Sequence, residues 1–455
     1  MRRAWAMCAV VWLGLGCGGV EEPVEPEASL EVQEQEHRVA RGSTRQVRPV
    51  EGPTFGRLVG VDGQGNAFIS LAYEREGVDL GGGELPGWAG LALAKYGPDG
   101  KHLWSRGFPT YNGQRPTVSA LTVDAAGNLY VAGAHGEPLL SLGGEPLPPG
   151  PFLAKYAPDG THLWSHPAKL PGLEVLAPSA LAVDETRGQL VLAVNFLDKG
   201  QPLGAALLGR VRVEDGTVLA VKPVVRWGRL SVTSLALDPS GNIAVVGFFE
   251  GEVDLGGGPL STTLPRSPFI ARFTPDARHL WSRALVGAEG VATGVAVEST
   301  CTLVVGEYSG AFSFRKRKQS AMGRDAFVAA YGPKGQELWV RHFAEGATAV
   351  TVDGENRVVV TGRYRPGDSA GGSTLPFRAG GTPANHVFVV KLHRGSGNTE
   401  WSRGLFSDGV LGVSGLAEMR SGEALLLGNL TGTLDSGAGR VTLPTSSAVL
   451  LRLVR

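Results

Sequence analysis

Short apolar stretches, each ended by a polar turn, follow one another along most of this chain. Typical examples are ALTVDAAGNLYVAG at 120–133 and SLALDPSGNIAVVG at 234–247, in which apolar runs flank a turn of Asp, Gly and Asn. Runs rich in Val, Leu and Ile between such turns are typical of β-strands, and no stretch shows the 3.6-residue period of an amphipathic helix. The pattern therefore predicts an all-β chain.

A second pattern recurs about every 60 residues. An apolar strand, a Pro-Asp-Gly turn and a Leu-Trp-Ser strand follow one another, as in KYGPDGKHLWSR at 95–106 and KYAPDGTHLWS at 155–165. The two patterns together predict seven copies of a four-stranded unit, since a fixed period indicates stacked supersecondary units. The Trp position of successive copies falls at Trp104, Trp164, Ala220, Trp281, Trp339 and Trp401.

Four-stranded sheets repeated around an axis form a β-propeller. In the second copy we expect strands at 120–123, 129–132, 152–156 and 162–165. The first strand carries small residues suited to a crowded centre, and the fourth carries the bulky Trp and should be outermost. The sequence thus predicts a seven-bladed β-propeller over residues 43–455. An open β-solenoid is the alternative, although solenoid coils are usually much shorter.

The two ends of this region complement each other. The last copy stops at SAVLLRLVR, residues 447–455, after its third strand, while a strand-length piece, STRQVRPV at 43–50, precedes the first copy. We expect this piece to complete the seventh blade, because pairing would remove an exposed sheet edge.

The N-terminus has the pattern of an export signal. Arg2 and Arg3 precede an apolar run, Ala4 to Leu15, that is too short to span a bilayer, and Gly16-Cys17 follow. A buried helix is the alternative. Residues 14–17 resemble the bacterial lipoprotein box, with Gly14 where that family prefers Leu. The resemblance implies a signal peptide over 1–17 and lipid on Cys17, which would anchor the protein to a membrane surface. Cleavage by an ordinary signal peptidase remains open.

Residues 18–42 differ from the rest in charge. Seven glutamates and two prolines lie between Glu21 and Glu36, which predicts an extended, disordered tether. The chain has 43 basic and 43 acidic residues. Without the leader and the tether a small basic excess remains, too even for a nucleic-acid binder. Cys301 is the one cysteine beyond the leader, so no disulfide can form there, and its apolar neighbours favour a buried thiol.

Two segments resemble a known group. ALTVDAAGNLYVAG and DAFVAAYGPKG are similar to the bacterial β-propeller repeats (SBBP-like) of exported cell-surface proteins and lipoproteins, especially of myxobacteria. The blades also resemble, more distantly, those of quinoproteins and of outer-membrane assembly lipoproteins. The resemblance covers residues 44–455. It implies the propeller fold and an outer-membrane or cell-surface location, with periplasmic or secreted forms as alternatives.

Residues that recur in every blade should serve folding. His102, His162 and His279 share one repeat position and should lie in separate blades, and Asp62, Asp124, Asp184 and Asp238 are turn formers. The glycine runs at 81–83 and 256–258 lack the helix and Lys of a phosphate loop. We find no nucleophile elbow, no His-x-x-x-His pair and no adjacent cysteines. We therefore assign no catalytic, cofactor-binding or metal-binding residue. Acid pairs for glycoside hydrolysis cannot be recognised without geometry.

Topology predicts one face with variable loops. The second-to-third loops and the links between blades should emerge together, opposite the short turns, and binding residues concentrate in such loops. The basic run Arg315-Lys316-Arg317-Lys318 replaces the Asp-Leu-Gly-Gly of other blades. It is either a solvated loop tip or a contact for anionic polymer or lipopolysaccharide phosphate. Candidates for the partner face are Tyr73, Arg75, Tyr111, Asn112, Arg115, Arg226, Trp227, Phe248, Phe249, Arg315, Lys316, Arg317, Lys318, Tyr364, Arg365, Asn385 and His386.

These observations favour a non-catalytic scaffold of the cell envelope. We expect a lipid-anchored monomer that needs no cofactor and binds an envelope protein or a polysaccharide with its loop face. The alternative is an enzyme, a lyase or hydrolase, acting on polysaccharide at the central channel. Fold alone does not decide between them.

Overall fold

The computed structural model describes residues 44–50, 52–111, 115–168, 175–196, 204–343, 345–370, 373–375, 386–419, 421–436 and 439–454. The expected leader and tether, with Cys17, lie outside these ranges, as do Asn112 and Asn385. The described residues form β-strands and no helix, as the sequence predicts.

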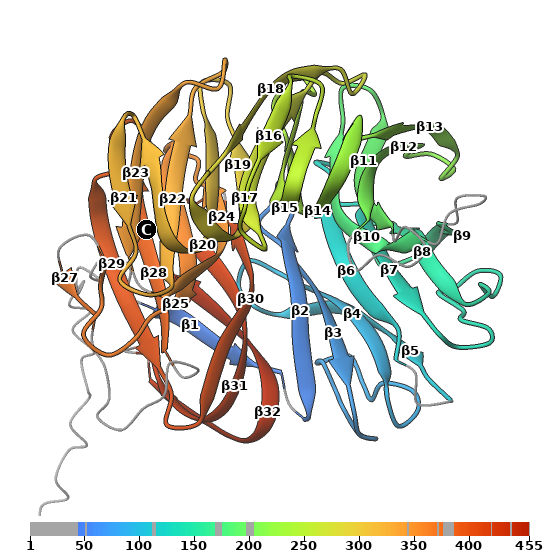
Figure 1. The fold of residues 1–455 in the computed structure, drawn as a ribbon. Helices are drawn as coiled ribbons and strands as arrows, with labels where there is room; N and C mark the ends of the chain where they lie inside the picture. Colours follow the sequence, from blue (N-terminus) through green and yellow to red (C-terminus); the bar gives the residue numbers. More distant parts are fainter. Residues whose placement is uncertain are drawn as a thin grey trace, which may run out of the picture. The chain divides into compact units, whose positions relative to one another are not determined.

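The strands form seven four-stranded antiparallel sheets, the blades of a β-propeller (Figure 1). Blade 1 consists of β2 (Thr54–Val61), β3 (Ala67–Tyr73), β4 (Gly90–Tyr96) and β5 (His102–Pro109). Blade 2 consists of β6 (Thr117–Val123), β7 (Leu129–His135), β8 (Gly150–Tyr156) and β9 (His162–Pro167). Blade 3 consists of β10 (Val175–Asp184), β11 (Gln189–Phe196), β12 (Ala205–Arg212) and β13 (Val218–Pro223). The predicted strands of the second copy are therefore confirmed, each somewhat longer than expected.

The later blades carry additional short strands. Blade 4 consists of β14 (Trp227–Leu237), β15 (Ile243–Asp254), β17 (Ser267–Phe273) and β18 (His279–Ala284), and the short β16 (Pro259–Ser261) pairs with β15. Blade 5 consists of β19 (Ala288–Val297), β20 (Thr302–Phe314), β22 (Asp325–Tyr331) and β23 (Glu337–Phe343), and the short β21 (Arg317–Ser320) pairs with β20. Blade 6 consists of β24 (Gly346–Val352), β25 (Arg357–Arg363), β28 (His386–His393) and β29 (Thr399–Phe406). The pair β26 (Ser369–Ala370) and β27 (Ser373–Thr374) lies between β25 and β28 in sequence.

Blade 7 is closed by the N-terminal strand. Its order is β30 (Val410–Glu418), β31 (Ala424–Asp435), β32 (Arg440–Leu453) and β1 (Thr44–Pro49). β1 runs antiparallel to β32, with Val47 opposite Leu451. The predicted completion of the last blade is thus confirmed, and β1 covers the edge that β32 would otherwise expose.

The first strand of each blade lies innermost and contacts the first strands of both neighbouring blades, β30 returning to β2. Each of these seven strands contains a β-bulge at one repeat position. In three blades the bulged residue binds the next blade through its hydroxyl: Ser119 to the Pro178 carbonyl at 2.6 Å, Thr233 to Ala292 at 2.5 Å and Thr293 to Ala347 at 2.8 Å. In these three blades the bulge therefore joins neighbouring blades at the centre.

The tryptophans join the blades at the outside. The indole Nε1 of Trp104, Trp164, Trp281 and Trp339 donates to a backbone carbonyl in the next blade, at 2.7–3.1 Å. Each ring also covers the third-to-fourth turn of that blade. A Cβ at Gly335, where φ is +75°, would lie 2.7 Å from the Trp281 ring. The turn glycine is therefore required both by its backbone conformation and by the neighbouring indole.

Of the three seams in which the described residues form no such indole bond, two show a compensating change. Blade 3 has Ala220 in place of Trp, and the facing turn of blade 4 has Ala277 in place of Gly, with φ at 60°. Because no indole covers that turn, a Cβ fits there. At the seam between blades 7 and 1, Gln46 Nε2 donates to the Asp99 carbonyl at 3.2 Å, so that β1 replaces an indole with an amide.

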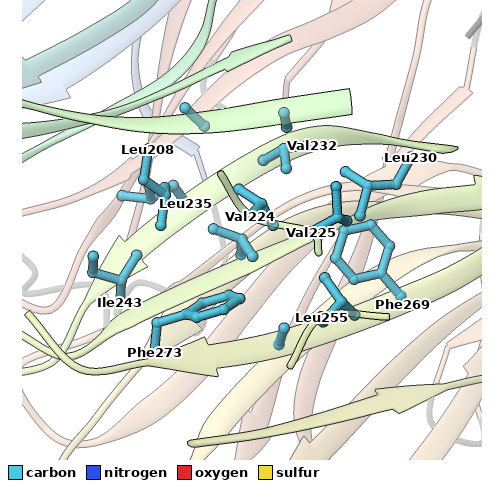
Figure 2. Packing of buried hydrophobic residues seen from close by; sticks show 14 of the residues in the cluster. Leu208, Val224, Val225, Leu230, Val232, Leu235, Ile243, Leu255, Phe269 and Phe273 are labelled. Atoms are coloured by element: carbon cyan, nitrogen blue, oxygen red, sulfur yellow. The ribbon is translucent and has the colours of Figure 1, made fainter. Parts of the chain in front are cut away.

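The apolar core lies between adjacent blades. Between blades 3 and 4, Leu208, Val224 and Val225 pack against Leu230, Phe269 and other buried residues (Figure 2). Equivalent clusters fill the other seams. This explains why several strands are apolar on both faces.

Candidate functional site

Four residues that we expected at the partner face belong to the core instead. Tyr73, Phe249, Tyr364 and His386 have no exposed surface. The Tyr73 hydroxyl donates to the Pro86 carbonyl at 2.6 Å, and the rings of Tyr364 and His386 pack edge to face with centroids 5.1 Å apart. These side chains stabilise the fold, and their assignment to a contact surface was wrong.

The cause is the path of the second-to-third loops. In blade 1 this loop runs back along the blade instead of projecting, and the Leu80 carbonyl accepts a hydrogen bond from the Tyr96 hydroxyl at 3.0 Å. The loop tip packs on the His102 ring, since a Cβ at Gly82 would lie 2.3 Å from the ring carbon Cε1. In blades 2 and 4 the rings of His162 and His279 pack against the equivalent glycine pairs, at 143–144 and 256–257. The expectation that these histidines serve structure is therefore consistent with their contacts.

The basic run of blade 5 follows the same path. Arg315 and Lys316 form the turn between β20 and β21, and the Arg315 amide donates to the Glu337 carboxylate. Glu337 begins β23, directly after the third-to-fourth turn. The run therefore lies at the outer edge of blade 5, toward the short turns, and our placement of it among the variable loops was wrong.

The aspartates of the first turns cap their own turns. Asp62 Oδ1 accepts the Gln64 and Asn66 amides, both at 2.9 Å, and its other oxygen lies 3.4 Å from the Lys95 ammonium. The pair Lys391–Asp353 repeats this contact in blade 6 at 2.6 Å, with both side chains buried. In the described part of the chain, no three His, Cys, Asp or Glu side chains are grouped as metal ligands.

One carboxyl on an inner strand has an altered pKa. Burial raises the pKa of Glu418 to about 7, with a further contribution from the Asp353 carboxylate, although the Gly354 amide that donates to Glu418 acts against this rise. The unfolded carboxyl titrates near 4.5. Between these two values the folded state alone binds the proton, so this group makes the fold less stable as pH rises from 4.5 through 7.

The E418Q variant tests this effect. A neutral amide lacks the buried charge, so the variant should be more stable than the parent at pH 8, on the order of 1 kcal/mol after allowance for partial exposure. At pH 4.5 the two proteins should differ little. Urea unfolding at both pH values measures the difference. An equal difference at the two pH values would contradict the assignment.

Two aromatic side chains are exposed where blade 1 meets the link to blade 2. Trp88 is 64% exposed and Tyr111 is 86% exposed. They adjoin the last backbone contact between β4 and β5, in which the Thr110 amide donates to the Ala89 carbonyl at 2.8 Å. We call these two side chains, with the neighbouring ion pair of Arg115 and Glu74, the aromatic platform. It lies at the end of blade 1 opposite the short turns.

The platform is held by its neighbours. The Tyr111 amide donates to the Glu137 carboxylate of blade 2 at 3.3 Å. Burial, and to a lesser extent the nearby Tyr111 hydroxyl, raises the pKa of Tyr73 to about 12.

The sequence indicated Tyr111 and Arg115 as partner-face residues, and Trp88 was missed. A signal was present, because Pro-Gly-Trp-Ala-Gly places a large apolar residue between two glycines in a loop.

The remaining candidates lie in blades 1, 4 and 6. Arg75 is exposed, Trp227 is 47% exposed at the start of β14, and Arg365 forms an ion pair with Glu345 at 3.1 Å. Arg226 donates its amide to the Asp254 carbonyl, and the Phe248 ring lies 5.5 Å from the Arg266 guanidinium. Arg75 directly follows Glu74 of the platform, whereas the other residues belong to other sheets.

No protein-family model matches the chain, and no curated protein matches it significantly. Solved structures with a similar fold include quinohemoprotein alcohol dehydrogenase from Comamonas testosteroni, 10% identical with a TM-score of 0.45, which matches over 91% of this chain and 76% of its own. BamB from Moraxella catarrhalis is 10% identical with a TM-score of 0.38, over 88% and 85%. The Dos1 propeller is 8% identical with a TM-score of 0.45, over 91% and 95%.

These likenesses concern the fold alone, and at such TM-scores none carries an argument about function. Among the residues that the structure describes, no helix has the length and apolarity to cross a membrane.

Proposed function

We propose that the protein is a non-catalytic binding scaffold of the cell envelope that holds a partner protein on the aromatic platform. The observation that carries the proposal is the exposure of Trp88 and Tyr111, which flank the backbone hydrogen bond between Thr110 and Ala89. In this proposal the leader exports the chain, lipid on Cys17 anchors it, and the acidic tether holds the propeller away from the membrane.

The composition of the platform favours a protein partner. Trp, Tyr and Arg are the residues most enriched among those that dominate binding energy at protein interfaces. Large aromatic side chains bring much contact area at a low cost in conformational entropy. The platform also has a rigid support, because the strands beneath it belong to a buried sheet and Tyr73 is fixed by its bond to Pro86.

A photo-crosslinking experiment identifies and tests the partner. A photoreactive phenylalanine analogue replaces Trp88 in the intact protein, and in a parallel sample it replaces Trp227, an exposed tryptophan on another blade. We expect a protein that crosslinks through position 88 and not through position 227. Its affinity is then measured for the parent, for W88A/Y111A and for W227A.

The double variant should weaken binding at least about 30-fold, which corresponds to about 2 kcal/mol for a dominant contact. W227A should bind like the parent. Equal losses in both variants, or full affinity in W88A/Y111A, would contradict the assignment. Crosslinking to glycan alone would show that the platform binds a polysaccharide instead.

A further inference from the structure

The structure points to a second binding site on blade 5, away from the aromatic platform. We propose that a cleft between the β20–β21 hairpin and β23 binds a polysaccharide that carries phosphate or carboxylate groups. We call it the blade 5 cleft. Its volume is about 460 Å³, and it is lined by Phe314, Arg315, Arg317, Gln319 and residues 338–341. This volume is within the usual range of ligand sites and exceeds what a single small ion needs.

Two arginines of the cleft differ in their contacts: among the described residues, the Arg315 guanidinium is held by a hydrogen bond, and the Arg317 guanidinium is not. The Arg315 guanidinium donates to the Leu338 carbonyl at 2.9 Å, which orients it across the hairpin. The Arg341 guanidinium is already occupied by acceptors around the next blade's turn, including the Ser396 carbonyl at 2.7 Å. Arg317 differs, because its guanidinium has no hydrogen-bond or ion-pair partner in the part of the chain that the structure describes. A guanidinium without a partner can take an oxyanion in a bidentate contact.

The hairpin keeps these cations at a conformational cost. Arg315 and Lys316 form a two-residue turn, with φ of 51° and 63°. Such turns favour Asn-Gly, because residues with a side chain resist positive φ. Strained backbone of this kind persists where neighbouring contacts enforce it, and it is concentrated at functional sites. Here the contacts are the Glu337 carboxylate on the Arg315 amide and the 2.8 Å contact between Gln319 and the His342 ring.

Blade 5 differs from its neighbours at this point. In blades 1, 2 and 4 a histidine ring packs on a glycine pair and closes the loop tip against the blade. Blade 5 has Glu337 in the place of that histidine, and the two turn residues carry long cationic side chains. Blade 5 therefore has a cationic tip beside a cleft at the place where the other three blades have a glycine pair covered by a histidine.

The polar surroundings favour a saccharide over a bare ion or a nucleic acid. β23 is the outermost strand and pairs only with β22, so one edge of its backbone is open to hydroxyl groups beside the cleft. The Gln319 amide lies in the same lining. The propeller carries only a small excess of basic charge, which is too little for a nucleic-acid surface. The cationic cleft is thus a local site and not part of an extended basic surface.

A matched pair of variants tests the cleft. R317Q and K318Q each remove one positive charge from adjacent residues. Of these two residues, Arg317 lines the cleft and Lys318 does not. The full chain is titrated at fixed salt with polygalacturonate, with polyphosphate and with neutral dextran. We expect at least one polyanion to bind and dextran not to bind. R317Q should lower the affinity about tenfold or more, the usual consequence of losing a charge-assisted hydrogen bond, and K318Q should change it less than about threefold.

A second variant separates binding from folding. R315N/K316G installs the turn sequence that this conformation prefers and removes two charges. The melting temperature should rise while polyanion binding falls. The two polyanions distinguish phosphate from carboxylate as the recognised group. Absence of binding to both polyanions, equal losses in R317Q and K318Q, or full affinity in R315N/K316G would each overturn the proposal. None of these outcomes depends on the aromatic platform.

Discussion

Replacing Trp339 by alanine should lower the free energy of unfolding by about 3–5 kcal/mol, the usual loss for a large buried aromatic residue. Trp339 is 7% exposed, its Nε1 donates to the Arg394 carbonyl at 2.7 Å, and its ring covers Gly397 of the next blade. The alanine variant would leave a cavity at the seam between blades 5 and 6. Urea unfolding followed by tryptophan fluorescence measures the loss.

The conservative variants W339F and W401F separate the hydrogen bond from the packing. Both lose an indole N–H and keep an aromatic ring. Trp401 Nε1 has no hydrogen-bond partner among the described residues, in agreement with the absence of a third-to-fourth turn in blade 7. W339F should therefore cost about 1 kcal/mol more than W401F. Equal costs would show that the indole bond does not stabilise the seam.

A chain that begins at residue 51 should be less stable than one that begins at residue 38 by more than about 3 kcal/mol. The shorter chain lacks β1 and the adjoining Val50, so that it loses the buried Thr44 and Val50 side chains. It also loses the ion pair of Arg45 with Glu423 and the bond from Arg48 to the Gly100 carbonyl. It also exposes the edge of β32. Thermal unfolding of both proteins measures the difference.

The comparison has a built-in control, because both chains lack the leader and most of the acidic tether. The chain that begins at residue 38 should unfold like the full-length protein. The chain that begins at residue 51 should also associate as its concentration rises, since an unpaired edge strand is a template for another chain. Equal melting temperatures for the two truncated proteins would contradict the closure of blade 7 by β1.

The sequence predicted the repeated elements of the fold because each is set by local chemistry that recurs. Turn aspartates such as Asp62, the Pro-Asp-Gly turns and the Trp position mark the blade, and the incomplete last copy indicated where β1 belongs. The compensation between Ala220 and Ala277 could not be predicted, because it joins residues of different blades. The replacement of an indole by Gln46 across the closing seam is non-local in the same way.

The candidate site was harder to predict, since exposure depends on the path of a loop. Tyr73 ends the second strand of blade 1 and Tyr364 follows that of blade 6, where a projecting loop would leave both on the surface. Instead, Tyr73 bonds to Pro86 of its own loop, and Tyr364 packs in a cluster with Ala370 and Leu375. The same path moves Arg315 away from the variable face. The flanking glycines of Trp88 indicate an exposed loop, whereas the blade 5 cleft depends on side chains from β20, β21 and β23.

A disulfide between β1 and β32 tests the closed ring most directly. Val47 and Leu451 lie opposite each other in the ladder, and cysteine is a small apolar replacement for both. In the folded protein, V47C/L451C should form an intramolecular disulfide under mild oxidation, and the offset pair V47C/Val449→Cys should not. The linked protein should run as a monomer on a non-reducing gel and melt at a higher temperature than its reduced form. Failure to link, or linkage only between two chains, would contradict a propeller closed by its own N-terminal strand.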